Sequence, residues 1–200
     1  MIAWLLVPVA YLIGAFPTSY VVGRLARGID LREHGSGNLG ATNAFRVLGW
    51  KAALPVFAVD IFKGWLPVYV FPRLDGEPFA WAFAYGAAAI VGHVFSIYVR
   101  FKGGKGVATG AGVFLALAPW AVLIGAVVWG GLVYYTRVVS IASLGAAAVF
   151  PFAVRWTTGT GPVFWLALGL AGFVVYAHRS NIGRLLRGEE HRFGKVRQNR

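Results

Sequence analysis

Long apolar runs, each near the length of a membrane-crossing helix, constrain this chain more than any other feature of its sequence. A helix needs roughly 20 apolar residues to cross about 30 Å of hydrocarbon. Five runs qualify, at residues 2–23, 52–72, 79–99, 138–154 and 163–177. Because 58% of the 200 residues are hydrophobic and only 13% are charged, a soluble fold of this size could not bury the apolar surface. The sequence therefore predicts an all-α integral membrane protein.

The number of spans depends on how the apolar stretch between Val107 and Tyr134 folds, since Pro119 interrupts it. One helix there gives six spans and places both termini on one side, whereas a hairpin of two short helices gives seven. Lys and Arg concentrate in the short loops on the cytoplasmic side of a membrane. With seven spans and the N-terminus outside, 16 of the 19 Lys and Arg residues fall on that side. The charges therefore favour seven transmembrane helices and a cytoplasmic C-terminus.

We expect a single transmembrane helical domain over residues 1–200, because the sequence has no internal repeat, low-complexity tract or linker. The first residues lack the positively charged start of a cleavable signal peptide, so they predict a retained span. The net charge of +12 lies in short gaps between apolar runs, which fits anionic lipid or phosphorylated substrates rather than nucleic acid. The basic end, residues 195–200, is expected to be disordered or to bind lipid weakly. The absence of Cys excludes disulfides and a thiolate nucleophile.

The first polar segment, residues 33–46, reads EHGSGNLGATNAFR and follows the first apolar run. Its glycines allow consecutive backbone N–H groups to turn toward one anion. Arg46 adds a charged, two-pronged donor. Side chains that add further hydrogen bonds are Ser36, Asn38, Thr42 and Asn43. A flexible turn with ordinary capping residues is the alternative, but the density of polar groups favours an anion site.

The second polar segment, residues 100–109, reads RFKGGKGVAT and leads into an apolar helix. Glycines, Lys105 and a helix N-terminus are the ingredients of a phosphate site. The segment is not a Walker A loop, because Gly106 stands where Ser or Thr would follow the lysine. A positively charged loop that only orients the chain is the alternative.

The third polar segment, residues 176–188, reads YAHRSNIGRLLRG. His178, Asn181 and Arg184 are three residues apart, so a helix would place them on one face. A neutral histidine there could take a proton or orient a substrate hydroxyl. A helix that holds its charges among lipid headgroups is the alternative.

Charged groups also lie inside the apolar runs, where they are costly unless paired. Asp60 and Lys63 are three residues apart, and we expect a mutual ion pair that anchors the bundle. His93 is interpreted as a packing hydrogen bond, and no set of residues calls for a metal ion. A role for Ser143 does not follow from the residues alone, because an intramembrane serine usually bonds its own helix backbone.

Three motifs in this order resemble the PlsY-type acyl-phosphate:glycerol-3-phosphate acyltransferases: GSGNLGATN, then Gly92-His93 leading to FKGGKGVAT, then HRSNIGRLLRGEEHRFG. The similarity includes DIFKG at 60–64 and SIAS at 140–143. It implies an enzyme of seven helices that moves a fatty acyl group from acyl phosphate to the 1-hydroxyl of glycerol 3-phosphate. Products are lysophosphatidic acid and inorganic phosphate, in bacterial phospholipid synthesis. The resemblance places this enzyme in the bacterial cytoplasmic (inner) membrane, without a cofactor, with membrane lipid and an upstream acyl-phosphate-forming enzyme as candidate partners.

The resemblance also implies an active site on the cytoplasmic face. Its catalytic residues would be Ser36, Arg46, Lys105, Ser143, His178 and Asn181. Residues expected to bind substrate phosphate are Gly37, Asn38, Thr42, Asn43, Gly103, Gly104, Gly106 and Thr109. Because acyl phosphate is already an activated anhydride, no covalent enzyme intermediate is needed. Substrate-assisted catalysis, in which a phosphate oxygen takes the hydroxyl proton, is the mechanism we expect.

Two other functional classes use similar features. A transporter for a phosphorylated solute would have cations and glycine loops, but its site usually lies near the middle of the membrane. Here the polar segments are predicted to share one face. A membrane scaffold would leave the three polar segments unexplained.

Overall fold

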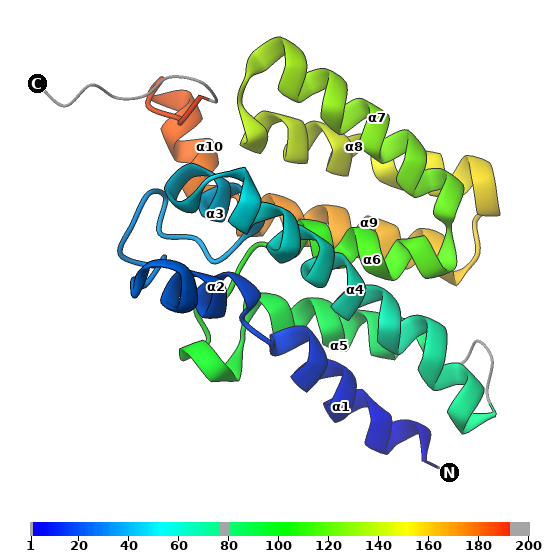
Figure 1. Cartoon of the computed structure of the whole chain (residues 1–200). Coiled ribbons are helices and arrows are strands. Elements are labelled where there is room, and N and C mark those ends of the chain that lie inside the picture. Colours follow the sequence, from blue (N-terminus) through cyan, green and yellow to red (C-terminus); the bar gives the residue numbers. More distant parts are fainter. Residues whose placement is uncertain (1, 77–80, 193–200) are drawn as a thin grey trace, which may run out of the picture. The chain divides into compact units, whose positions relative to one another are not determined.

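Helices are the only regular elements that the computed structural model contains in its described residues, 2–76 and 81–192 (Figure 1). The chain divides into two compact units, Met1–Leu117 and Ala118–Arg200. The first contains α1 (Ala3–Ala15), α2 (Thr18–Arg27), α3 (Ala41–Leu48), α4 (Trp50–Asp75), α5 (Ala82–Val94), the 3₁₀ helix η1 (Ile97–Val99) and α6 (Val107–Leu117). The second contains α7 (Pro119–Thr136), α8 (Val139–Thr158), α9 (Pro162–Ala177) and α10 (Arg179–Leu186). The predicted basic tail at 195–200 lies outside the described residues.

Five helical segments are long and apolar enough to cross a membrane: Ala3–Arg27, Trp50–Leu74, Ala82–Val99, Pro119–Thr136 and Val139–Thr158. Helices α9 and α10 pass the same test only as a pair, with a bend of 56° between them. Helix α6 is apolar but has only 11 residues. The described residues thus hold five candidate spans, or six with the bent pair. The predicted seventh span would have to be α6.

Prolines set two of the helix breaks. Pro17 has no N–H to donate, and it forces the preceding Phe16 out of the helical region, to a ψ of 118°. The first predicted span is therefore two helices, α1 and α2, and not one continuous helix. The stretch from 107 to 134 also breaks, before Pro119, which takes the first position of α7, where proline is favoured. Two helices therefore occupy this stretch, as the hairpin alternative expected, but only α6 is short.

Glycines allow very close helix contacts in the first unit. Gly14 of α1 lies against the backbone of α5, and Gly92 of α5 lies against the backbone of α1. Gly64 of α4 and Gly112 of α6 make the same kind of contact with each other's helix. A Cβ atom at any of the four would overlap the facing backbone. Small residues of this kind drive helix association in membranes, where burial of apolar surface does not.

The expected ion pair between Asp60 and Lys63 is confirmed, with 2.7 Å between Oδ1 and Nζ. It also stabilises the break in the first span. Lys63 Nζ donates a hydrogen bond to the Phe16 carbonyl at the end of α1, and Thr18 Oγ1, at the start of α2, donates to Asp60 Oδ1. The cation thus faces the negative end of one helix dipole, and the anion faces the positive end of the next.

In the second unit, α8 contacts both α7 and α9 (Figure 1). Helix α10 continues from α9 after the 56° bend, with His178 at the junction. The third polar segment is therefore carried by the bend and by α10. Ser143 lies near the start of α8.

Candidate functional site

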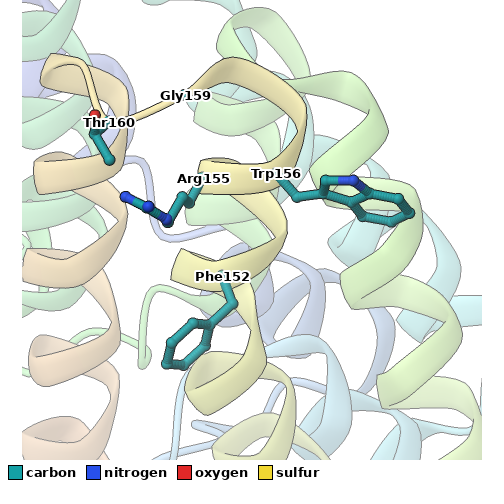
Figure 2. Close-up of a pocket in the computed structure, with 5 residues that line it drawn as sticks. All are labelled: Phe152, Arg155, Trp156, Gly159 and Thr160. Atoms are coloured by element: carbon teal, nitrogen blue, oxygen red, sulfur yellow. The ribbon is translucent and has the colours of Figure 1, made fainter.

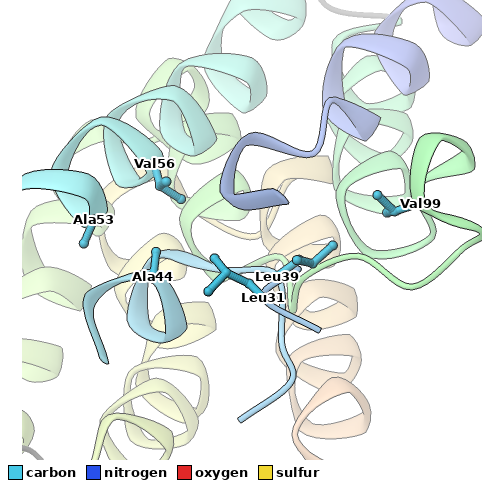
Figure 3. Close-up of a cluster of buried hydrophobic side chains, with 6 residues drawn as sticks. All are labelled: Leu31, Leu39, Ala44, Ala53, Val56 and Val99. Carbon is cyan, nitrogen blue, oxygen red and sulfur yellow. The ribbon is translucent and has the colours of Figure 1, made fainter. Parts of the chain in front are cut away.

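The loop at residues 28–40, between α2 and α3, packs on an apolar cluster that fixes its shape (Figure 3). The cluster is made of Leu31, Leu39, Ala44, Ala53, Val56 and Val99, all buried. These residues come from the loop, α3, α4 and η1, so segments far apart in the sequence meet under the loop. The first and second polar segments are therefore neighbours within the first unit.

A buried carboxylate ties the loop to the second segment. The Arg32 guanidinium donates to both oxygens of Asp30, at 2.6 Å for the shortest of these hydrogen bonds. Arg32 Nη1 also donates to the Val99 carbonyl at 3.1 Å. The hydrogen bonds from Arg32 hold the pKa of the Asp30 carboxyl below its ordinary value of 3.8. Asp30 therefore stays charged and keeps Arg32 directed at η1.

The Asn43 side chain organises the glycine turn of the first segment. Its Oδ1 accepts the Ser36 backbone N–H at 2.8 Å, and its Nδ2 donates to the carbonyls of Leu31 and His34, both at 3.0 Å. Both amide hydrogens are thus used, and the residue is only 1% exposed. The expectation that Asn43 binds phosphate therefore needs correction, because its donors are occupied. Its side chain positions Ser36 instead.

The other expected residues of the first segment remain accessible around this turn. Ser36 and Asn38 are half-buried. Gly37 has a φ of 71°, a conformation that other residues rarely adopt. Thr42 is half-buried in the first turn of α3, and Arg46 is exposed in its last turn. The segment therefore presents hydroxyl, amide and guanidinium groups around one turn and one short helix.

Two glycines of the second segment have a different role from the one expected. The Gly103 N–H donates to the Val94 carbonyl at 3.0 Å, and the Gly104 N–H donates to the His93 carbonyl at 3.1 Å. A Cβ at Gly103 would overlap the His93 carbonyl, and one at Gly104 would overlap the His93 ring. The expectation that these N–H groups hold phosphate needs correction, because both are bonded to the end of α5. Glycine is required here for close packing.

The start of α6 supplies donors that Gly103 and Gly104 cannot. Gly106, with a φ of 81°, turns the chain so that α6 begins at the next residue. The first N–H groups of a helix have no acceptor within the helix. Lys105 is half-buried beside this end, and the fully buried Thr109 Oγ1 has no partner among the described residues. This short region can hold an anion with a cation and backbone donors.

In the second unit, His178 is 4% exposed, and its ring has a defined orientation. Its Nδ1 lies 2.8 Å from the Val174 carbonyl. Because a carbonyl only accepts hydrogen bonds, Nδ1 carries the hydrogen, and in the neutral ring Nε2 carries the lone pair. Nε2 can therefore accept a hydrogen bond from a hydroxyl.

Sequence reasoning missed Glu190, which joins two residues of the third segment. Asn181 Nδ2 donates to Glu190 Oε1, and Arg184 Nε donates to Oε2, each at 2.8 Å. Burial raises the pKa of Glu190, but the hydrogen bonds from Arg184 and Asn181 outweigh it, so the pKa lies below its ordinary value. The shared carboxylate confirms that Asn181 and Arg184 lie on one face. The signal in the sequence that could have identified Glu190 is a carboxylate within a strongly basic stretch.

Sequence reasoning also missed a partner of Ser143. Trp129 Nε1, on α7, donates to Ser143 Oγ at 3.2 Å. Ser143 is 4% exposed. No sequence spacing relates these residues, because they belong to different helices.

The structure thus distributes the expected catalytic residues between the two units. Ser36, Arg46 and Lys105 belong to the first, where their two segments are in contact. Ser143, His178 and Asn181 belong to the second. The described residues contain no group of three or more side chains suited to a metal ion.

An open hollow lies at the opposite end of α8 from Ser143 (Figure 2). It is lined by Phe152, Arg155, Trp156, Gly159 and Thr160. By helix rise, Arg155 is about 18 Å from Ser143 along the helix. The hollow is therefore separate from the expected site residues of this unit.

Comparisons with known proteins agree along nearly the whole chain. The family described as glycerol-3-phosphate acyltransferase matches residues 4–188. A glycerol-3-phosphate acyltransferase of Anaeromyxobacter sp. (strain Fw109-5) is 45% identical, over 94% of each chain. Glycerol-3-phosphate acyltransferase 3 of Bacillus anthracis is 48% identical, over 94% of this chain and 93% of that one.

Solved structures show the same similarity. A crystal structure of PlsY (YgiH), an integral membrane glycerol 3-phosphate acyltransferase, in its glycerol 3-phosphate form has a TM-score of 0.91 and 39% identity. The alignment covers 97% of this chain and 96% of that one. The lysophosphatidic acid form has a TM-score of 0.88 and 38% identity, with the same coverage.

Proposed function

The chain belongs to the glycerol-3-phosphate acyltransferase family, and we propose that it takes its acyl group from acyl phosphate and places it on the 1-hydroxyl of glycerol 3-phosphate. It is an integral membrane enzyme of phospholipid synthesis, as the family and its apolar helices indicate. The proposed products are lysophosphatidic acid and inorganic phosphate. The proposed donor is supported by the resemblance of the three polar motifs.

One observation supports phosphate binding more than any other: the two glycine-containing segments of the first unit are in direct contact. Arg32, just before the first segment, donates to the Val99 carbonyl, just before the second. Gly104 lies against the Leu39 carbonyl. Lys105, the start of α6 and the Ser36 turn therefore belong to one compact region. Such a region suits a dianionic phosphate, which needs several donors and a cation at once.

Two phosphorylated reactants repel each other, so the enzyme has to offset their charge while a carbonyl is attacked. We assign this role to Arg46 and Lys105, with Ser36, Gly37, Asn38, Thr42, Gly106 and Thr109 contributing donors near them. Fixed cations and dipoles of this kind stabilise developing negative charge with little reorganisation. Asn43, Gly103 and Gly104 contribute by shaping the two segments.

In the proposed reaction, the hydroxyl oxygen of glycerol 3-phosphate attacks the carbonyl carbon of acyl phosphate. The bond between that carbon and the phosphate oxygen breaks, and inorganic phosphate leaves. The hydroxyl proton passes to a phosphate oxygen of a bound reactant. We assign His178 Nε2 to orient the hydroxyl, and Asn181 and Ser143 to bind the reactants. The Nδ1 hydrogen bond to Val174 supports this role, because it fixes which nitrogen accepts.

The proposed topology has seven spans, with the N-terminus outside and the C-terminus cytoplasmic. The distribution of Lys and Arg supports it, and so does the separation of α6 and α7 at Pro119. On this topology α6 is a short span of roughly 16 Å by helix rise. We place the active site at the cytoplasmic face of the bacterial inner membrane, where acyl phosphate from an upstream enzyme would arrive.

The deciding experiment uses the purified full-length protein in detergent or lipid, with acyl phosphate and glycerol 3-phosphate. Phosphate release that requires both reactants, with formation of lysophosphatidic acid, supports the proposal. The same acyl group supplied as its coenzyme A thioester is the matched control and should give no product. Transfer from the thioester but not from acyl phosphate would overturn the proposed donor. Accumulation of glycerol 3-phosphate inside vesicles without turnover would support a transporter instead.

A further inference from the structure

Ser143 has an unusual partner for a serine inside an apolar helix. The indole N–H of Trp129, one helix earlier, donates to its Oγ at 3.2 Å. Ser143 is only 4% exposed, so its hydroxyl group is buried where it meets the indole.

Three threonines in the same unit bond in the ordinary way. Thr136, Thr157 and Thr158 each donate to the carbonyl four residues earlier in the chain. Such back-bonding is the usual solution for a hydroxyl in a membrane helix. Ser143 makes no such hydrogen bond among the residues described for this unit. Its hydroxyl is therefore held by another helix.

The hydrogen bond from Trp129 determines whether the Ser143 hydroxyl accepts or donates in this contact. An indole N–H can only donate, so Ser143 Oγ accepts in this contact. The serine O–H then remains to donate to a third group. A phosphate oxygen only accepts when ionised, so a hydroxyl committed to donation matches it.

We infer that Trp129 is a positioning residue that holds the Ser143 hydroxyl as a hydrogen-bond donor to the phosphate of a bound reactant. This inference rests on the proposed function, which places Ser143 in the site. Trp129 itself touches only the serine in this role. The ligand class is a phosphate group, either that of glycerol 3-phosphate or the one released from acyl phosphate.

The test measures binding of glycerol 3-phosphate and of inorganic phosphate to the full-length protein in detergent by calorimetry. Trp129→Phe removes the N–H and keeps an aromatic ring. It should weaken binding of at least one probe by about 3- to 10-fold, the effect of one net hydrogen bond. Trp120→Phe is the matched control, because Trp120 lies on the same helix and is 70% exposed. It should leave both dissociation constants unchanged.

A double-variant cycle separates positioning from general packing. In a Ser143→Ala background, Trp129→Phe should change binding by less than about 2-fold, because the hydroxyl to be oriented is gone. Each probe is titrated to about 100 times the wild-type Kd, so that binding weakened by the loss of one hydrogen bond can still be measured. An equal loss in the Ser143→Ala background would overturn the inference, as would unchanged binding in Trp129→Phe.

A second variant covers the case in which Trp129→Phe disturbs folding. Site-specific incorporation of 3-benzothienylalanine at position 129 keeps the shape of the ring and replaces only the N–H by sulfur. It should repeat the weakening of phosphate binding with an unchanged Tm, and in turnover it should raise KM with kcat within about 2-fold. If the variant binds both probes as tightly as the wild-type protein, the inference is overturned. Failure of the wild-type protein to transfer acyl groups overturns the proposed function instead.

Discussion

Lys63 and Asp60 form an ion pair inside α4, with 2.7 Å between Nζ and Oδ1 and both side chains less than 5% exposed. The pair is anchored at both ends, since Lys63 also donates to Phe16 and Asp60 also accepts from Thr18. Each charge therefore has a further partner in the broken first span. The pair is a structural joint between that span and α4.

Replacing one member of this pair should lower the free energy of unfolding much more than replacing both. Lys63→Met leaves the Asp60 carboxylate buried and uncompensated, and should lower the free energy of unfolding by about 3–5 kcal/mol. The double variant Asp60→Asn, Lys63→Met should lose much less. Unfolding in detergent, followed by circular dichroism, measures both. Equal losses in the single and double variants would contradict a compensated pair.

Lys105 and Arg46 should be required for turnover. Lys105→Ala and Arg46→Ala should each lower kcat/KM at least about 100-fold, because each removes a cation assigned to offset phosphate charge. Lys102→Ala is the control, since Lys102 belongs to the same segment but is exposed. It should stay within about 2-fold of wild type in phosphate-release assays. An active Lys105→Ala enzyme would refute the phosphate site in this segment.

Asn43→Asp should lower stability although the two side chains have the same shape. The carboxylate cannot donate to the carbonyls of Leu31 and His34, and each buried group left unpaired costs about 1–3 kcal/mol. Asn38→Asp makes the same chemical change at a half-buried residue of the same segment and should leave Tm nearly unchanged. Thermal unfolding of both proteins tests this difference. A similar Tm for the two variants would argue against Asn43 as the organiser of the turn.

Gly104→Ala should fail through packing. The added Cβ would overlap the His93 ring, so the second segment would have to shift away from α5. We expect reduced Tm and a loss of kcat/KM. Gly169→Ala, in α9, meets nothing within 4 Å and should keep both values. A wild-type Tm and turnover in Gly104→Ala would contradict the close contact.

The Asp30–Arg32 pair predicts a pH dependence of stability. Because the pKa of Asp30 is lower in the folded protein than its ordinary value of 3.8, the pair stabilises fully above that value. The stabilisation is lost as the pH falls below 3.8 and through the folded-state pKa. Asp30→Asn should therefore lower Tm at pH 7, and the difference from wild type should shrink in acid. The exposed Glu33, changed to Gln, should show a smaller difference throughout.

The sequence predicted the features that depend on composition and on local spacing. Apolar runs located four of the five single candidate spans, whereas the run at 163–177 qualifies only together with α10. The three-residue spacing of Asp60 and Lys63 predicted their ion pair. The two-helix alternative around Pro119 is also found. The break at Pro17 was missed, because residues 2–23 were treated as one apolar run although a proline lies within it.

The less predictable part of the site depends on contacts between segments. Glycine repeats indicated exposed backbone donors, yet the N–H groups of Gly103 and Gly104 are bonded to α5. A glycine motif can bind a ligand or allow a close helix contact, and the position of the neighbouring backbone determines which of the two occurs. Trp129 and Glu190 were missed for a related reason, because their partners lie 14 and 9 residues away in the chain.

The break between α1 and α2 has a consequence for how the chain is made. The carbonyls of Ala15 and Phe16 at the end of α1 receive hydrogen bonds from Ser96 and Lys63, which a ribosome adds much later. In hydrocarbon, backbone groups without donors are costly. We therefore expect α1 and α2 of the nascent chain to remain at the insertion machinery until α4 and η1 have been synthesised. Crosslinking of nascent chains halted before and after these later residues would reveal that delay.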